Sequence, residues 1–215
     1  MNYWKIDKED ICNGEGLRVV LWLSGCSHKC KGCQNPQTWD ANSGIPFDES
    51  AKEELFRELD KDYISGLTLT GGDPLFEENL DGVLDLVTEV NKRYNTVQNI
   101  VQNQDKNHNI LNANVNKIRL SNPQKSIWLY TGYTWEDILC DESETKDIYI
   151  CDYYMKLLNM YQKRRKILSL CDVLIDGRYI DSERDITLQY RGSKNQRLIN
   201  IKKSIQKGEI VLWDK

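Results

Sequence analysis

The sequence lacks long apolar runs and lacks a strong excess of either charge. No stretch approaches the ~20 apolar residues that a transmembrane helix needs, and the first residues have no basic and then apolar signal pattern. The 29 basic and 33 acidic residues leave a formal net charge of -4. No general attraction to nucleic acid or to an anionic membrane is therefore expected. We expect a cytoplasmic protein that binds neither.

The chain also lacks the cysteine pattern of a disulfide-stapled protein. Its 7 cysteines are an odd number, in a chain of 215 residues that can build a core without disulfides. In the cytosol such thiols are reduced, so they are free to bind a metal or to be buried. Four of them are isolated in the sequence, and we expect these to be small apolar filler in the core. They are Cys12, Cys140, Cys151 and Cys171.

The remaining cysteines form one compact motif. Cys26, Cys30 and Cys33 are separated by three and then two residues. The apolar run 19–23 leads into them and is typical of a buried strand, whereas 34–40 is polar and interrupted by a proline, as in a loop. The thiols are thus predicted on a loop at the C-terminal end of a strand. Ligands collect at that end in parallel α/β sheets.

Three thiolates can hold a metal centre but cannot complete four coordination positions. A structural zinc site usually has four ligands, and an iron–sulfur cube usually takes one thiolate per iron. Three cysteines would leave one iron of such a cube open to a ligand that is not protein. A zinc site that recruits His28 or a distant cysteine, and three unrelated thiols, are the alternatives that the spacing leaves open.

A second motif follows the short apolar stretch 66–70, which is predicted to be a strand. Gly71 and Gly72, followed by Asp73 and Pro74, come directly at its end. Glycines there let the backbone approach a ligand closely or adopt a positive φ. We expect a side chain at Gly72 to impair ligand binding more than folding. An ordinary tight turn between a strand and a helix is the alternative.

Strands and helices alternate along most of the chain. Apolar runs predict strands at 19–23, 66–70, 127–131 and 171–177, helical spacing predicts helices at 77–92 and 153–170, and 210–213 is expected to be a closing strand. This order predicts an α/β fold with a mostly parallel sheet, and the small number of βα units predicts a partial barrel. We expect a single domain over 1–215. An asparagine-rich segment at about 95–124 is predicted to be a surface insertion.

These motifs together resemble one family closely, the activating proteins of anaerobic (class III) ribonucleoside-triphosphate reductase in the radical S-adenosylmethionine superfamily. The cysteine spacing is shared by the whole superfamily, whereas the later motifs are the more specific ones. The matching segments are Gly14–Val19, Cys26–Asp40, Thr70–Pro74, Ile127–Trp135, Asp172–Gly177 and Arg191–Arg197. One departure is an aspartate, Asp73, where the superfamily motif more commonly has glutamate.

The resemblance implies a fold, a chemistry and a partner. Cys26, Cys30 and Cys33 would be the catalytic and metal-binding residues, holding a [4Fe–4S] cluster that passes one electron to S-adenosylmethionine bound at the open iron. The resulting radical would remove hydrogen from a glycine of the reductase large subunit, and a low-potential electron donor would supply the electron. The residues implied to bind the cosubstrate are Gly71, Gly72, Asp73 and Pro74, with Thr131 and Asp176 at later strand ends.

Other functions remain open at this stage. The chain could activate another glycyl radical enzyme, or it could be a small radical enzyme that acts on a metabolite. A zinc-binding interaction module without catalysis is the alternative from a different class.

Overall fold

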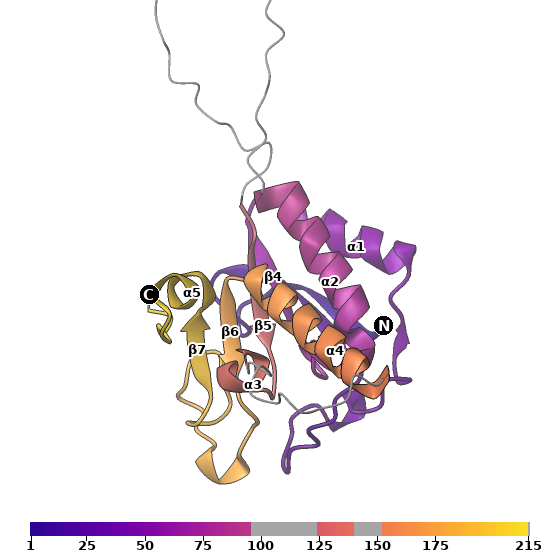
Figure 1. The fold of residues 1–215 in the computed structure, drawn as a ribbon. Coiled ribbons are helices and arrows are strands. Elements are labelled where there is room, and N and C mark those ends of the chain that lie inside the picture. The colour runs from indigo at the N-terminus through magenta and orange to yellow at the C-terminus, as the bar shows by residue number, and fades with distance from the viewer. Residues whose placement is uncertain (96–123, 140–151, 215) are drawn as a thin grey trace, which may run out of the picture.

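The computed structural model describes residues 1–95, 124–139 and 152–214. Within these residues one sheet of seven strands forms the centre of the fold (Figure 1). The strands are β1 (Asn2–Asp10), β2 (Leu17–Leu23), β3 (Ile45–Pro46), β4 (Ile64–Gly71), β5 (Ser126–Tyr130), β6 (Val173–Asp176) and β7 (Arg197–Asn200). The α-helices are α1 (Glu49–Leu59), α2 (Leu80–Val90), α3 (Trp135–Leu139), α4 (Asp152–Ser169) and α5 (Ile201–Lys207).

The sheet is mixed, with a parallel centre and antiparallel edges. Its strand order is β3-β1-β2-β4-β5-β6-β7. Strands β2, β4, β5 and β6 pair in parallel, whereas β1 and β3 on one side and β7 on the other are antiparallel. The α/β class is confirmed, but the predicted mostly parallel sheet needs correction at both edges. No α-helix joins β1 to β2 or β6 to β7, and parallel neighbours need such a crossover.

Strand β1 was not apparent from the sequence pattern. Its nine residues are largely polar, and Tyr3 is the one that is buried. An outer strand that packs one residue into the core carries almost no period-2 signal. The predicted closing strand at 210–213 does not form a regular strand. Leu212 makes an isolated β-bridge with Ile199 there.

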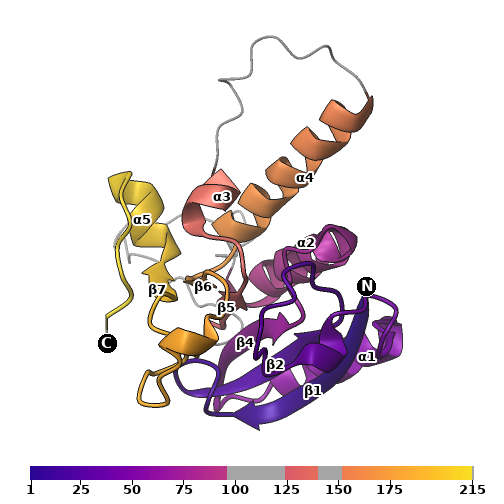
Figure 2. The same cartoon turned by 90° about the horizontal axis from the view of Figure 1, so that it is seen from below.

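Side chains of the central strands alternate between two different faces. In β4, Leu67 and Leu69 belong to the main hydrophobic core, while Thr68 and Thr70 point the other way. Helices α1, α2 and α4 lie along the core face (Figures 1 and 2) and bury their apolar stripes there. The opposite face is therefore left free of these helices, and the candidate site lies on it.

The parallel register brings the loops after three strands to one edge of the sheet. Leu23 at the end of β2 pairs with Gly71 at the end of β4, and β4 pairs in turn with β5. The segments that begin at Ser24, Gly72 and Thr131 are consequently neighbours, although they are far apart in the sequence.

The predicted asparagine-rich insertion at about 95–124 lies almost wholly outside the described residues. Its two ends are joined, since Asn95 Nδ2 donates to the Lys125 carbonyl at 3.0 Å and Lys125 N donates back to Asn95 Oδ1 at 3.1 Å. Lys125 is buried, and its Nζ donates to the carbonyls of Lys61 and Ile64. Among the helices that the structure describes, none is long and apolar enough to cross a bilayer.

Candidate cofactor site

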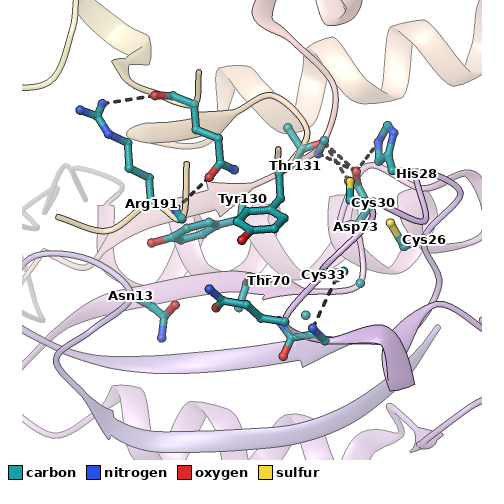
Figure 3. A pocket seen from close by; sticks show the side chains of 18 of the residues that line it. Asn13, Cys26, His28, Cys30, Cys33, Thr70, Asp73, Tyr130, Thr131 and Arg191 are labelled. Atoms are coloured by element: carbon teal, nitrogen blue, oxygen red, sulfur yellow. Dashed lines mark hydrogen bonds and ion pairs between the residues drawn. The ribbon is translucent and has the colours of Figure 1, made fainter. Parts of the chain in front are cut away.

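A cavity of about 410 Å³ lies at the C-terminal ends of β2, β4 and β5 (Figure 3). Most of the residues that the sequence motifs single out line it together. They are Cys26, Cys30, Cys33, Gly71, Gly72, Asp73 and Thr131. Pro74 and Asp176 do not line it. Its volume is in the usual range of about 300–1,000 Å³ for small-molecule sites.

Backbone hydrogen bonds hold the base of the cysteine loop. Gly25 N donates to the Thr38 carbonyl at 2.7 Å, and Cys26 N donates to the Trp39 carbonyl at 3.0 Å. These bonds tie the start of the loop to the segment that follows the third cysteine. The loop is thus closed on itself, and all three half-buried thiols face the same cavity.

The thiols lie in surroundings that disfavour their ionised form when no metal is bound. Burial raises the pKa of Cys26 to about 11, and the Asp73 carboxylate adds to this shift. Burial also raises the pKa of Cys30. At neutral pH both are thiols, so a metal that binds here must displace their protons.

Three thiols that line one cavity are a donor set that a [4Fe–4S] cluster can use. Among the residues described, no group of three or more His, Cys, Asp or Glu side chains is arranged to hold a single ion. A zinc ion needs all its ligands within about 2.0–2.3 Å of one centre. A [4Fe–4S] cluster binds each thiolate through a different iron.

The two glycines after β4 are required by backbone packing. Gly71 has φ +99°, and a Cβ there would lie 2.8 Å from Leu23 N. A Cβ on Gly72 would lie 2.5 Å from the carbonyl oxygen of Gly25. The glycines therefore allow β4 to pack against the base of the cysteine loop. The expectation that a side chain at Gly72 impairs ligand binding more than folding needs correction, because the added carbon would meet the protein's own backbone.

The carboxylate of Asp73 is fully used within the protein. It is buried, and it accepts hydrogen bonds from Thr131 Oγ1 at 2.8 and 3.0 Å, from Gly132 N at 2.9 Å and from Leu75 N at 2.8 Å. These donors come from its own turn and from the loop after β5. The backbone of Asp73 is engaged as well, since its N–H donates to the Gly25 carbonyl and its own carbonyl accepts from Phe76 N. Thr131 thus supports the carboxylate of a turn that the protein holds on several sides.

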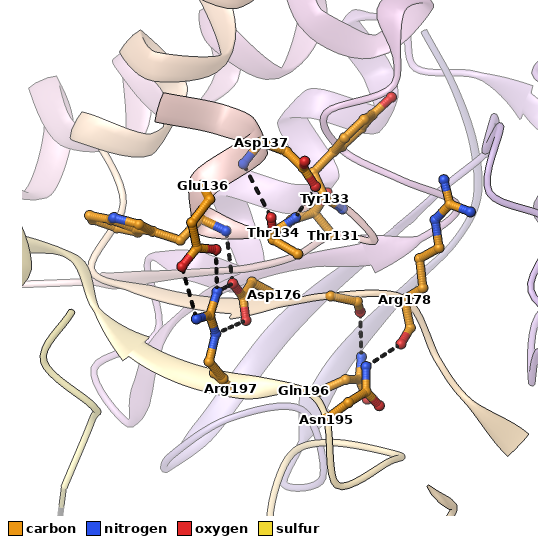
Figure 4. A network of polar contacts seen from close by, with 12 residues as sticks. Thr131, Tyr133, Thr134, Glu136, Asp137, Asp176, Arg178, Asn195, Gln196 and Arg197 are labelled. Atoms are coloured by element: carbon orange, nitrogen blue, oxygen red, sulfur yellow. Dashed lines mark hydrogen bonds and ion pairs between the residues drawn. The ribbon is translucent and has the colours of Figure 1, made fainter. Parts of the chain in front are cut away.

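Asp176 belongs to a separate polar network beyond the cavity (Figure 4). Its carboxylate accepts from Arg197 Nε at 3.0 Å and from Trp135 N at 2.8 Å, and Arg197 also pairs with Glu136. These carboxylates raise the pKa of Arg197, with Asp176 the larger cause. Asp176 thus connects β6, α3 and β7, and the structure does not bring it together with the cysteine loop.

Several cavity residues were missed by the sequence reasoning. Trp22, Thr70 and Tyr130 occupy the side of β2, β4 and β5 opposite the core, so strand alternation could have identified them. No local signal marks Tyr190, whereas Arg191 opens the motif 191–197 but was not predicted to be a site residue. Both reach the cavity from the loop before β7.

The isolated cysteines differ among themselves. Cys171 is fully buried, as expected of an apolar filler. Cys12 is exposed and lines the cavity, so that interpretation is wrong for Cys12. Cys140 and Cys151 lie outside the described residues.

Comparisons with known proteins show the family of this chain. The chain matches the 4Fe-4S single cluster domain family over residues 12–113 and 103–199. It is 36% identical to the anaerobic ribonucleoside-triphosphate reductase-activating protein of Enterobacteria phage T4, over 92% of this chain and 93% of that protein. The proteins of the same name from Pasteurella multocida and Escherichia coli K12 are 33% and 31% identical over 91% of this chain, and over 95% and 96% of their own lengths. The chain belongs to the family of anaerobic ribonucleoside-triphosphate reductase-activating proteins.

Proposed function

We propose that this chain is a radical S-adenosylmethionine enzyme that places a glycyl radical on an anaerobic ribonucleoside-triphosphate reductase. The observation that carries the proposal is that the three thiols and the Gly-Gly-Asp turn line one cavity at adjacent strand ends. Family membership supplies the substrate, because the relatives are named for activating that reductase.

Cys26, Cys30 and Cys33 would hold the [4Fe–4S] cluster. The chemistry supplied by a bound cluster is one-electron reduction of the sulfonium of S-adenosylmethionine, which yields methionine and the radical that abstracts hydrogen from the reductase glycine. The three-thiol donor set supports this assignment, since it leaves one iron for the cosubstrate. A low-potential electron carrier is required as a second partner.

The chain's own residues would bind and orient the cosubstrate. Gly71, Gly72 and Asp73 are proposed to orient the methionine end, with Pro74 fixing the turn outside the cavity. Asp73 and Thr131 hold this turn against the loop after β5 through their mutual hydrogen bonds. Asp176 is left out of the proposed pocket because its carboxylate pairs with Arg197.

Three broader predictions form part of the same proposal. One domain over 1–215 carries the activity, and its sheet is a shortened form of the superfamily barrel. The site of action is the cytoplasm, where reduced thiols persist.

Electron paramagnetic resonance tests the proposal directly. The reconstituted, reduced protein is mixed without oxygen with S-adenosylmethionine and the class III reductase of the same source. We expect the doublet of a glycyl radical, and no such signal when this chain is omitted. Cleavage of S-adenosylmethionine without a radical on the reductase would refute the assignment of the reductase as the substrate. A colourless protein that binds zinc and no iron would refute the assignment as a radical enzyme.

A further inference from the structure

His28 is a buried side chain inside the cysteine loop, between Cys26 and Cys30. Its side chain is 4% exposed, whereas the neighbouring Ser27 and Lys29 are exposed. Nε2 lies 2.9 Å from Asp73 Oδ2, and Figure 3 shows His28, Asp73 and Thr131 directed toward one another. The approach is close but not collinear, since neither ring nitrogen has a partner with hydrogen-bond geometry in the described part of the chain.

The Asp73 carboxylate is the point at which three loops meet. Its own turn follows β4, and the donors Thr131 and Gly132 follow β5. His28 brings in the loop after β2. The cysteine loop thus reaches the same carboxylate as the two other loops that line the cavity.

The imidazole ring is also held on its other sides. Its centroid is 4.5 Å from that of Tyr133, in an edge-on contact. A Cβ on Gly132 would lie 2.3 Å from His28 Cδ2, so the loop after β5 packs directly on the ring. Arg164 of α4 stacks 3.9 Å from the Tyr133 ring and donates from Nε to the Leu75 carbonyl. His28 therefore has little freedom to swing out of this position.

We propose that His28 is a positioning residue, which docks the cysteine loop on Asp73 and so fixes Cys26 and Cys30 relative to the Gly-Gly-Asp turn. Nε2 is engaged by this carboxylate, and the same side of the ring lies against Gly132, so this nitrogen is not available to a metal held by the thiols. The inference rests on the proposed function in one respect, namely that the group which the loop positions is an iron–sulfur cluster. The docking itself is a property of the protein without metal.

Four variants separate docking from ligation. His28→Phe keeps a ring against Tyr133 but has no polar contact with Asp73. His28→Gln keeps an N–H donor at a similar reach. Gly132→Ala displaces the ring without changing His28. His108→Phe is the matched control, since it changes the other of the chain's two histidines.

The first measurement uses protein without metal. Iodoacetamide alkylation, followed by peptide mass spectrometry, gives the rate at Cys26 and Cys30 relative to Cys12. We expect His28→Phe and Gly132→Ala to raise this ratio roughly tenfold, as the loop loses a polar contact to a carboxylate. His28→Gln and His108→Phe should remain near the parent value. A parent-like ratio in both His28→Phe and Gly132→Ala overturns the proposal. If His28→Phe does not fold, the ratio in Gly132→Ala alone decides the proposal.

The second measurement uses reconstituted protein. We expect His28→Phe to keep its iron and to bind S-adenosylmethionine roughly tenfold more weakly, with affinity recovered in His28→Gln. If both variants instead lose iron as completely as Cys30→Ala, His28 is a ligand and the proposal is wrong. A parent protein that takes up no iron would refute the proposed function, while the alkylation ratios would still decide the docking role.

Discussion

Gly72 packs directly on the backbone of Gly25, so that a Cβ on Gly72 would meet the Gly25 carbonyl oxygen at 2.5 Å. Two hydrogen bonds hold the same contact, from Gly72 N to the Leu23 carbonyl and from Asp73 N to the Gly25 carbonyl, both at 2.7 Å. The turn after β4 and the base of the cysteine loop are consequently one structural unit. A change in either one is transmitted to the other.

The first prediction concerns Gly72→Ala. The added carbon must push the Gly25 backbone away, so we expect the free energy of unfolding to fall by about 2 kcal/mol and iron uptake to fall as well. Urea denaturation of the protein without metal measures the first effect. Gly82→Ala in α2 is the control. There the nearest atoms belong to the flexible Met1 side chain, and a helix gains up to about 1 kcal/mol from alanine. Parent-like stability in Gly72→Ala would contradict the packing argument.

The second prediction concerns the thiols. Replacing Cys26, Cys30 or Cys33 singly by Ala should abolish iron binding and cleavage of S-adenosylmethionine, because each is proposed to hold a different iron. Cys12→Ala should keep the parent iron content, although Cys12 lines the same cavity. Iron and sulfide analysis after anaerobic reconstitution provides the measurement. Loss of iron in Cys12→Ala would make Cys12 a fourth ligand and leave no open iron.

The third prediction concerns the segment between Asn95 and Lys125. Deleting residues 97–121 and bridging the gap with a short Gly/Ser linker should preserve folding and iron uptake. The Asn95 and Lys125 hydrogen bonds already hold the two ends together, and each halving of a loop changes its closure cost by only about 0.6 kcal/mol. Thermal unfolding and iron analysis test this. An insoluble product would show that apolar residues of the deleted segment belong to the core.

The fourth prediction concerns Arg197→Met. It would leave the Asp176 carboxylate, which is fully buried, without its cation. Breaking such a pair costs about 3–5 kcal/mol, and we expect a loss near the lower end because Arg197 is 32% exposed. Lys202→Met removes an ion pair to Asp172 from a side chain that is 69% exposed, and should cost at most about 1 kcal/mol. Equal losses in the two variants would contradict the argument.

The same variant should change how stability depends on pH. The hydrogen bond from Arg197 lowers the pKa of Glu136 in the folded protein. A carboxyl group whose pKa is lowered by folding stabilises the folded protein at pH values above its pKa in the unfolded chain. This stabilisation is lost as the pH falls through the pKa of the group in the folded protein. Denaturation between about pH 3 and pH 7 should therefore show a shallower acid loss in Arg197→Met than in the parent, by a small margin because Glu136 is 60% exposed. If stability falls equally steeply with decreasing pH in Arg197→Met and in the parent, the contribution of the Arg197–Glu136 pair is refuted.

The alternation of strands and helices could be predicted because it is a local property. Leu67 and Leu69 mark one side of β4, and Val83 and Val87 mark one side of α2, within a few residues of each other. The cysteine spacing is equally local, and so the metal-binding hypothesis needed no structure. β1 escaped prediction because it packs few of its side chains into the core and leaves little pattern.

Only the tertiary structure decided how the motif residues are used. Asp73 follows the end of β4 and Asp176 ends β6, and both were expected to bind the same cosubstrate. One meets His28 and Thr131 beside the cavity, and the other meets Arg197 and Trp135 away from it. The role of a buried carboxylate depends on the donors around it. Apart from Leu75 N, which lies in the same turn as Asp73, the donors named here come from residues about 20 to 60 positions away in the chain. Local sequence carries no information on such pairings, which arise when neighbouring strands of the sheet bring their ends together.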